Sequence, residues 1–176
     1  MRLIKTAYSV LLKVNRLFAL LAAFALALAA CSITYGVLAR NLFGKSTTWE
    51  LEAGIYLILY ATFFGAAYTH VAGGQIGINA LRDLLSARWQ RFHKIAGDSA
   101  TLAFFALIFH SGWHDMWTAF DRGWHSDTIW GPPLWIPFLS IPVGAALLVV
   151  TMALEIILTI SDHEPPQIIK SNRAAH

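Results

Sequence analysis

The sequence predicts an all-α integral membrane protein with four transmembrane helices, because its composition is strongly apolar and it contains four long apolar stretches. Hydrophobic residues make up 57% of the 176 residues and charged residues 13%, and the mean hydropathy is +0.56. A soluble domain of this length is seldom so apolar. Runs of about 20 apolar residues without the alternation of barrel strands satisfy their backbone amides in lipid only as helices. We therefore expect residues 1–176 to form one four-helix membrane domain.

The expected spans are separated by short connections and cover residues 17–39, 51–72, 95–120 and 134–160. A short tail, residues 161–176, follows the last span. Residues 3–16 and 79–94 are amphipathic, with apolar side chains on one side of a helix and basic side chains elsewhere. Such helices can lie flat at the inner membrane surface. The two segments equally suit extensions of the neighbouring spans or contacts with a partner.

Lysine and arginine indicate the orientation, because flanks rich in these residues tend to stay cytoplasmic. They concentrate before the first span and between the second and third, whereas the other two connections hold few of them or balance them with aspartate. Trp89 alone among the tryptophans lies on the inner side, and the rest form an aromatic belt on the outer side. We expect both termini in the cytoplasm of a bacterial cell. The net charge of +3 then reflects topology and anionic lipid, with no nucleic-acid partner.

The N-terminal segment has a competing interpretation. Leu28-Ala29-Ala30-Cys31 follows a basic start and resembles a bacterial lipoprotein cleavage site. The apolar run continues to Leu38, however, and no soluble domain follows it. Cleavage would also leave three spans and move the tail to the other side of the membrane, so we favour an intact first span. Within that span the small side chains of Ala19, Ala23, Ala27 and Cys31 are four residues apart, and we expect this stripe to let another helix approach closely.

Three charged residues lie at the first outer connection. Arg40 ends the first span, and Glu50 and Glu52 begin the second, so each charge lies where the helix macrodipole favours it. Thr47-Thr48-Trp49-Glu50 also has the spacing of a capping box, which accounts for Glu50. An unpaired carboxylate at the position of Glu52 would be costly. We expect Glu52 to pair with Arg40 or with a basic group of a partner protein; the alternative is a hydrated carboxylate at headgroup level.

The middle of each predicted span contains no charged side chain. The segments concerned are residues 24–29, 60–64, 103–106 and 147–150. Pumps and transporters mark their routes at this depth with ionisable side chains, broken helices and unwound carbonyls. Four spans without an internal repeat are also few for an alternating-access machine. The sequence therefore indicates an accessory or assembly subunit, neither the conduit itself nor an enzyme.

The histidines raise the alternative of a haem-binding electron carrier. His110 and His114 are four residues apart in the third span, and His70 ends the second. At a rise of 1.5 Å per residue, His110 lies about 22 Å beyond the inner end of its span, whereas His70 lies near the inner surface. One porphyrin cannot use both without strong tilting. His114 and His125 could join Asp115 at a metal, but the helix lacks the glutamate of a zinc-protease motif. We therefore expect no cofactor and no metal.

Several local patterns occur in register between about Gly36 and Leu158. They are Arg40-Asn41-Leu42-Phe43, Trp49-x-x-Glu52 followed by Tyr56, Phe64-Gly65-Ala66-Ala67, Gly73-Gly74-Gln75-Ile76-x-x-Asn79, and Pro142-Val143-Gly144-Ala145-Ala146. Together these patterns resemble those of the small membrane subunit, of DctQ type, of tripartite ATP-independent periplasmic (TRAP) transporters. The sequence departs from the family's pattern at Leu51, where a glutamate is usual, and at Gln75 and Asn79, which replace histidine and aspartate.

The resemblance implies a function in agreement with the accessory role. In this family the small subunit acts as a scaffold for a large membrane subunit, which moves an organic acid with sodium, while a separate periplasmic protein captures the substrate. The residues of the matching patterns are then candidates for the subunit interface. They are Arg40, Trp49, Glu52, Tyr56, Gly65, Gln75, Asn79, Pro142 and Gly144. A structural or regulatory four-span protein of another complex would share the same charge pattern, so that alternative stays open.

Overall fold

The computed structural model describes residues 2–44, 49–72 and 87–160, and the side chains within residues 6–44, 49–72 and 95–159. Four helices account for most of these residues: α1 (Arg2–Phe43), α2 (Trp49–Val71), α4 (Ala87–Asp121) and α5 (Trp135–Ile160). Each contains a segment long and apolar enough to cross a membrane. The predicted all-α architecture with four transmembrane helices is therefore confirmed.

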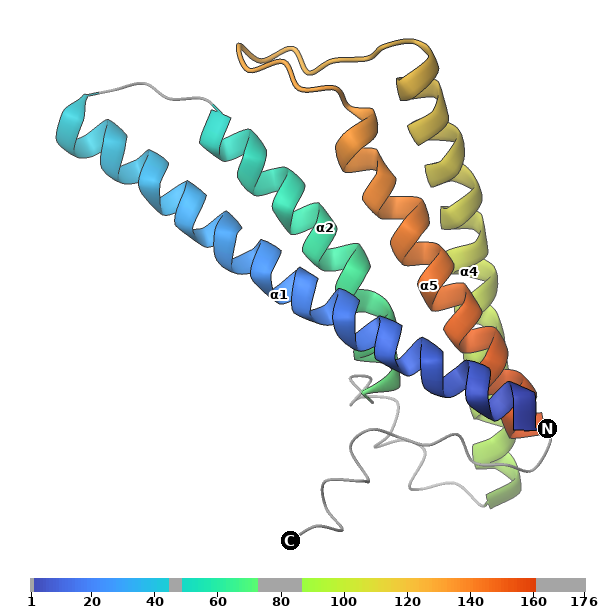
Figure 1. The fold of residues 1–176 in the computed structure, drawn as a ribbon. Helices are drawn as coiled ribbons and strands as arrows, with labels where there is room; N and C mark the ends of the chain where they lie inside the picture. The colour runs from blue at the N-terminus through green and yellow to red at the C-terminus, as the bar shows by residue number, and fades with distance from the viewer. Residues whose placement is uncertain (1, 45–48, 73–86, 161–176) are drawn as a thin grey trace, which may run out of the picture.

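The four helices are arranged in the order α1, α2, α5, α4, so the last helix of the chain lies between the second and the third (Figure 1). α1 packs mainly on α2, and α5 packs on both α2 and α4. The beginning of α1 also contacts the end of α5. The start of α1, the end of α2, the start of α4 and the end of α5 lie at the same end of the bundle (Figure 1). We call this the N-terminal end of the bundle. We call the opposite end the hairpin end, because residues 122–134, which connect α4 to α5, form a hairpin there. A buried cluster of Ala67, Leu148 and Met152 joins α2 to α5.

The first helix is one continuous rod of 42 residues. At a rise of 1.5 Å per residue it is about 60 Å long, which is twice the thickness of a bilayer core of about 30 Å. α1 is correspondingly inclined to α4 and α5 (Figure 1). The amphipathic segment of residues 3–16 is therefore continuous with the first span, one of the three arrangements that the sequence left open. The second amphipathic segment lies outside the described residues up to residue 86, and from Ala87 onward it belongs to α4.

The buried face of α1 follows a spacing of seven residues. The side chains of Tyr8, Asn15, Ala22 and Ala29 are buried, as is Gly36 at the next step. A repeat of seven keeps one narrow seam of a helix facing its neighbours along its whole length. The expectation of a contact stripe at four-residue spacing is therefore wrong within this chain, because Ala23, Ala27 and Cys31 are exposed. A four-residue repeat drifts around the helix, so such a stripe leaves the seam after a few turns.

Glycines allow two of the helix contacts to be very close. A Cβ atom at Gly144 of α5 would overlap the backbone of Phe63 in α2, with the carbonyl carbon 2.6 Å away. A Cβ atom at Gly112 of α4 would lie 2.5 Å from Cγ2 of Ile141 in α5. Both distances are far shorter than ordinary van der Waals contact. Small residues therefore set how closely α5 approaches its two neighbours, as they commonly do between helices in lipid.

The connection between α4 and α5, residues 122–134, is a hairpin that lies outside the helical bundle (Figure 1), and we call it the outer hairpin for this reason. Its two arms are joined by hydrogen bonds from the Ser126 amide to the Pro132 carbonyl (3.0 Å) and from the Leu134 amide to the Trp124 carbonyl (2.9 Å). The hairpin reaches across the bundle toward the start of α2 (Figure 1). The side chain of Ile129 in the turn is 93% exposed. The chain thus places an apolar side chain at the far tip of this hairpin.

Candidate subunit-interface site

A partly buried ion pair joins α1 to α2 at the hairpin end. Nη2 of Arg40 lies 3.2 Å from Oε1 of Glu50, whose side chain is 1% exposed, and the hydroxyl of Ser32 donates to the Glu50 carbonyl at 3.1 Å. Gly36 makes room for this carboxylate, because a Cβ atom there would come within 2.7 Å of its Cδ. The Arg40 side chain itself is 55% exposed. One side of the guanidinium therefore compensates Glu50, and the rest is open to a partner or to headgroups.

The neighbouring carboxylate, that of Glu52, is also buried inside the chain. It accepts hydrogen bonds from the phenol of Tyr56, one turn further along α2, and from the hydroxyl of Thr128 in the outer hairpin. The expected pairing of Glu52 with Arg40 is wrong, because Arg40 pairs with Glu50. The cause is helical geometry: two residues apart on a helix, the two carboxylates point to different sides. Thr47 and Thr48 of the expected capping box lie outside the described residues.

Thr128 thus fastens the outer hairpin to the start of α2. Replacing Thr128 with valine removes the hydroxyl but keeps the shape of the side chain, so the hairpin should open more often while the four helices stay folded. A hydrogen bond to a charged group is worth about 1.5–3 kcal/mol, which corresponds to at least a tenfold faster exchange of the amides of Ser126 and Leu134. Hydrogen exchange followed by mass spectrometry measures this rate in the purified chain.

Thr62→Val is the matched control for this prediction, since the Thr62 hydroxyl donates only to the Ile58 carbonyl of its own helix. It should leave the exchange of the hairpin unchanged. Equal exchange rates in wild type and Thr128→Val would show that the contact with Glu52 does not hold the hairpin.

A second polar cluster joins three helices at the N-terminal end. Glu155 of α5 accepts a hydrogen bond from the phenol of Tyr8 in α1 (2.8 Å), and its other oxygen lies 3.1 Å from Nε2 of His70 in α2. One turn before Glu155 along α5, the hydroxyl of Thr151 accepts a hydrogen bond from the side-chain amide of Asn15 in α1 at 2.9 Å. All five side chains are at most 10% exposed. In lipid, interhelical polar contacts of this kind hold helices together and fix their register.

The sequence carries a partial signal for this cluster, although none of its contacts was predicted. Tyr8 and Asn15 are seven residues apart, and Thr151 is a polar residue within a long apolar run. Polar residues in spanning helices commonly face other helices. The partner of each was not predictable, because the contacting residues of α1 and α5 are more than a hundred positions apart in the chain.

The predicted interface residues divide between the surface and the interior of the chain. Arg40 and Trp49 are exposed at the hairpin end. Tyr56 and Gly65 are partly buried, and a Cβ atom at Gly65 would lie 3.8 Å from the Cβ of Ala22 in α1, an ordinary van der Waals distance. Three residues are buried within the chain itself, namely Glu52, Pro142 and Gly144. Gln75 and Asn79 lie outside the described residues. Contact of any of these residues with a partner stays a prediction.

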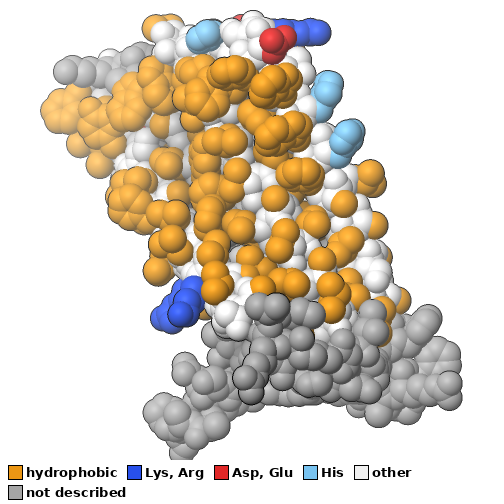
Figure 2. Space-filling view, turned by 45° about the vertical axis from the view of Figure 1, so that its right-hand side comes forward, with side chains coloured by type: hydrophobic (Ala, Val, Ile, Leu, Met, Phe, Trp, Pro, Cys, Tyr) orange, Lys and Arg blue, Asp and Glu red, His pale blue; other side chains and the backbone are white. Residues whose placement is uncertain are grey.

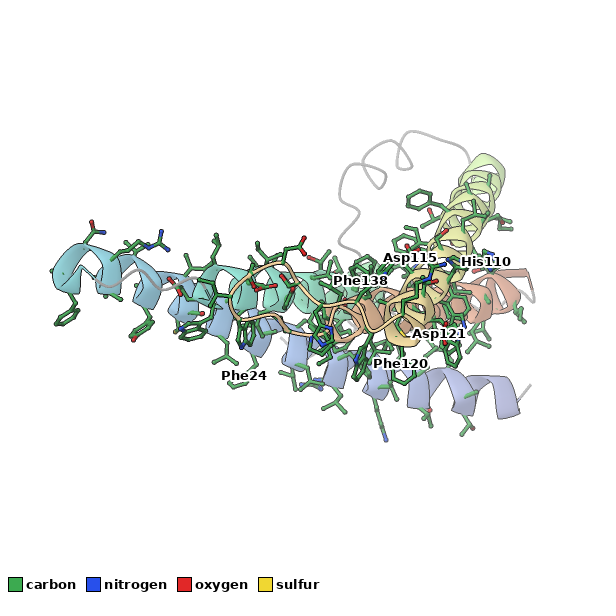
Figure 3. The ribbon with its side chains drawn as sticks, turned by 90° about the horizontal axis from the view of Figure 1, so that it is seen from above. Phe24, His110, Asp115, Phe120, Asp121 and Phe138 are labelled. Carbon is green, nitrogen blue, oxygen red and sulfur yellow. The ribbon has the colours of Figure 1, made fainter. Side chains whose placement is uncertain are left out.

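Large apolar surfaces remain open on the outermost helices. α1 and α4 expose leucine, phenylalanine and tryptophan side chains along most of their length (Figure 2). Phe24, for example, points from α1 away from the other helices (Figure 3). A shallow groove of about 410 Å³ also lies between α2 and α4 over α5, lined by small and hydroxyl-bearing residues such as Ala61, Gly65 and Thr101. These surfaces suit lipid tails or the helices of another membrane protein.

The histidines whose side chains the structure describes do not gather at one site. His70 contacts Glu155 at the N-terminal end, whereas His110 (Figure 3) and His114 are exposed on α4. Nδ1 of His125 lies 2.7 Å from the Gly123 carbonyl in the outer hairpin. Within the residues that the structure describes, no three His, Cys, Asp or Glu side chains are close enough to share a metal ion.

Comparison with known proteins identifies what this arrangement is similar to. Residues 29–162 match the model of the family described as tripartite ATP-independent periplasmic transporters, DctQ component. A C4-dicarboxylate TRAP transporter small permease protein of Vibrio cholerae is 25% identical over 134 residues, covering 64% of this chain and 57% of that protein. The corresponding protein of Rhodobacter capsulatus is 30% identical over 105 residues, covering 60% and 46% respectively. The chain thus spans about half the length of the curated relatives it matches.

Proposed function

This chain belongs to the DctQ component family of TRAP transporters, and from that membership we propose that it is the small accessory membrane subunit that scaffolds a large transport subunit. Its multi-pass character agrees with the four helices able to cross a membrane. DctQ components are transporter subunits and not enzymes. We further propose that the protein lies in the bacterial inner membrane with both termini in the cytoplasm, as the distribution of lysine and arginine predicts.

The observation that carries this proposal is the absence of a charged path through the spans. The sequence places no Asp, Glu, Lys, Arg or His in the middle segments of the four helices. The buried carboxylates Glu50, Glu52 and Glu155 all lie within about two turns of a helix end and are engaged by side chains of this same chain. Cargo that needs ionisable or unwound binding groups at mid-depth must therefore cross through another protein.

The proposed partners are a large multi-span TRAP membrane subunit and a periplasmic substrate-binding protein. The two relatives are named C4-dicarboxylate transporter proteins, so a C4-dicarboxylate is the first substrate to test among organic acids. We propose sodium as the coupling ion. The exposed apolar faces of α1 and α4 are the surfaces available to the large subunit, and the exposed ring of Trp49 and the guanidinium of Arg40 lie at their hairpin end.

Uptake of radiolabelled succinate into proteoliposomes tests this function. We expect no sodium-dependent uptake with this chain alone. Uptake should require the chain together with the large subunit and the binding protein, and the chain should purify with the large subunit in mild detergent. Sustained uptake by the chain alone would overturn the accessory role, and failure to purify with any large TRAP subunit would overturn the scaffold role.

A further inference from the structure

Two basic side chains on α1 lie at a depth where a bare charge is costly. Lys13 and Arg16 are three residues apart and both are exposed. Neither forms an ion pair with any residue that the structure describes, whereas Arg40 pairs with Glu50, and Arg122 lies over the ring of Trp124. Residues three apart on a helix lie on the same face. Lys13 and Arg16 therefore present two neighbouring cations on the surface of the bundle.

The contacts of Asn15 fix the depth of these cations. The Asn15 amide donates to Thr151 of α5, so Arg16 lies at the level of Thr151. α5 begins at Trp135, a residue typical of the membrane interface, and about 20 residues cross the hydrocarbon core. The opposite boundary of the core then falls near Glu155. The backbone of Arg16 lies about one turn inside the hydrocarbon, and Lys13 lies close to the boundary.

The direction of the Lys13 and Arg16 side chains determines which layer of the membrane their charged groups reach. Side chains of an α-helix tilt toward its N-terminus, which for α1 is toward the nearer membrane surface. An arginine one turn inside the core is long enough to bring its guanidinium to the headgroup layer while its methylenes stay in lipid. Figure 2 shows a basic side chain projecting from the apolar surface near the N-terminal end. The charged groups of Lys13 and Arg16 therefore both lie at the level of the lipid phosphates.

We propose that Lys13 and Arg16 form a binding site for the phosphate of an anionic phospholipid in the leaflet at the N-terminal end. Arg16 supplies a planar fork that fits two phosphate oxygens, and Lys13 supplies a point charge beside it. Exposed apolar side chains of the next turns, Leu17 and Leu20, offer contacts for the acyl chains. This site is independent of the proposed transport role, because it requires only the chain and a membrane.

Native mass spectrometry of the purified full chain tests the proposal with phosphatidylglycerol and phosphatidylcholine as probes. We expect wild type to retain phosphatidylglycerol more tightly than phosphatidylcholine. The double variant Lys13→Gln/Arg16→Gln should lose this preference. Because each basic residue near an anionic surface contributes roughly a fivefold factor, the affinity for phosphatidylglycerol should fall roughly thirtyfold.

Arg122→Gln is the matched control, since it removes an exposed cation at the opposite end of the bundle. It should retain the preference for phosphatidylglycerol. Equal lipid binding by wild type and the double variant would overturn the proposal. So would displacement of the lipid by millimolar inorganic phosphate, which would indicate a site for the free anion. Loss of the large subunit from the double variant in detergent without added lipid, with lipid binding unchanged, would assign the cations to a protein partner and would equally overturn it.

Discussion

Replacing Gly144 with alanine should lower the thermal stability of the bundle, although alanine is the better helix former. The new methyl group would overlap the backbone of Phe63, and a backbone cannot move aside by changing a rotamer. α2 and α5 must therefore separate, which also disturbs the adjoining cluster of Ala67 and Leu148. Overpacking of this kind typically costs about 1–3 kcal/mol. Unfolding of the purified chain in detergent, followed by tryptophan fluorescence, measures the loss.

Gly97→Ala provides a control with the opposite expected sign. Gly97 lies in α4, and a Cβ atom there would meet nothing within 4 Å. Alanine at such a position should leave the unfolding midpoint unchanged or raise it, because glycine inside a helix costs roughly 0.5–1 kcal/mol relative to alanine. If both variants shift the midpoint in the same direction, the close approach of α5 to Phe63 does not limit packing.

Removing either member of the buried pair of His70 and Glu155 should destabilise the chain more than removing both. His70→Leu leaves the Glu155 carboxylate with fewer donors in an apolar setting, and Glu155→Leu leaves the His70 ring and the Tyr8 phenol without this acceptor. Breaking a buried pair on one side typically costs about 3–5 kcal/mol, whereas replacing both members with apolar residues is often neutral. A double-mutant cycle on the free energy of unfolding measures the coupling.

Tyr8→Phe calibrates this cycle, because it removes one hydrogen bond to Glu155 and leaves the contact with His70 in place. It should cost less than His70→Leu. Additive effects of His70→Leu and Glu155→Leu would mean that the two side chains do not act as a pair, despite the separation of 3.1 Å between their polar atoms.

The positions of the spans could be predicted from the sequence, but the contacts between them could not. Hydrophobic runs set where a helix crosses a bilayer, and the ends of the expected spans lie within a few residues of α2 and α5. Helices in lipid are apolar on every side, so apolar periodicity does not distinguish a face against lipid from a face against protein. Small residues at four-residue spacing therefore did not mark the face by which α1 packs within this chain. The seven-residue spacing of Tyr8, Asn15 and Ala22 marks the face of α1 that is buried against the other helices.

The candidate interface shows the same limit at the level of single residues. The family-like patterns located the charged connection at Arg40 and the buried glycine at Gly144. They could not predict that Glu52 accepts from Thr128, because this contact joins residues 76 positions apart and depends on how the outer hairpin folds back. Two residues of the family-like patterns, Pro142 and Gly144, are buried inside the chain, and this could be learned only from the folded structure.

The length of α1 has a mechanical consequence. Tyr8 and Asn15 fix one end of this helix to α5, and the helix continues without a break for about 40 Å beyond that attachment. Because Arg40 and Ser32 join the far part of α1 to Glu50, a swing of α1 about this attachment would carry the start of α2 with it, and a swing of about 5° would displace that end by about 3–4 Å. A small change in the angle of α1 at its N-terminal end would therefore displace a protein bound near Arg40 at the other end of the helix.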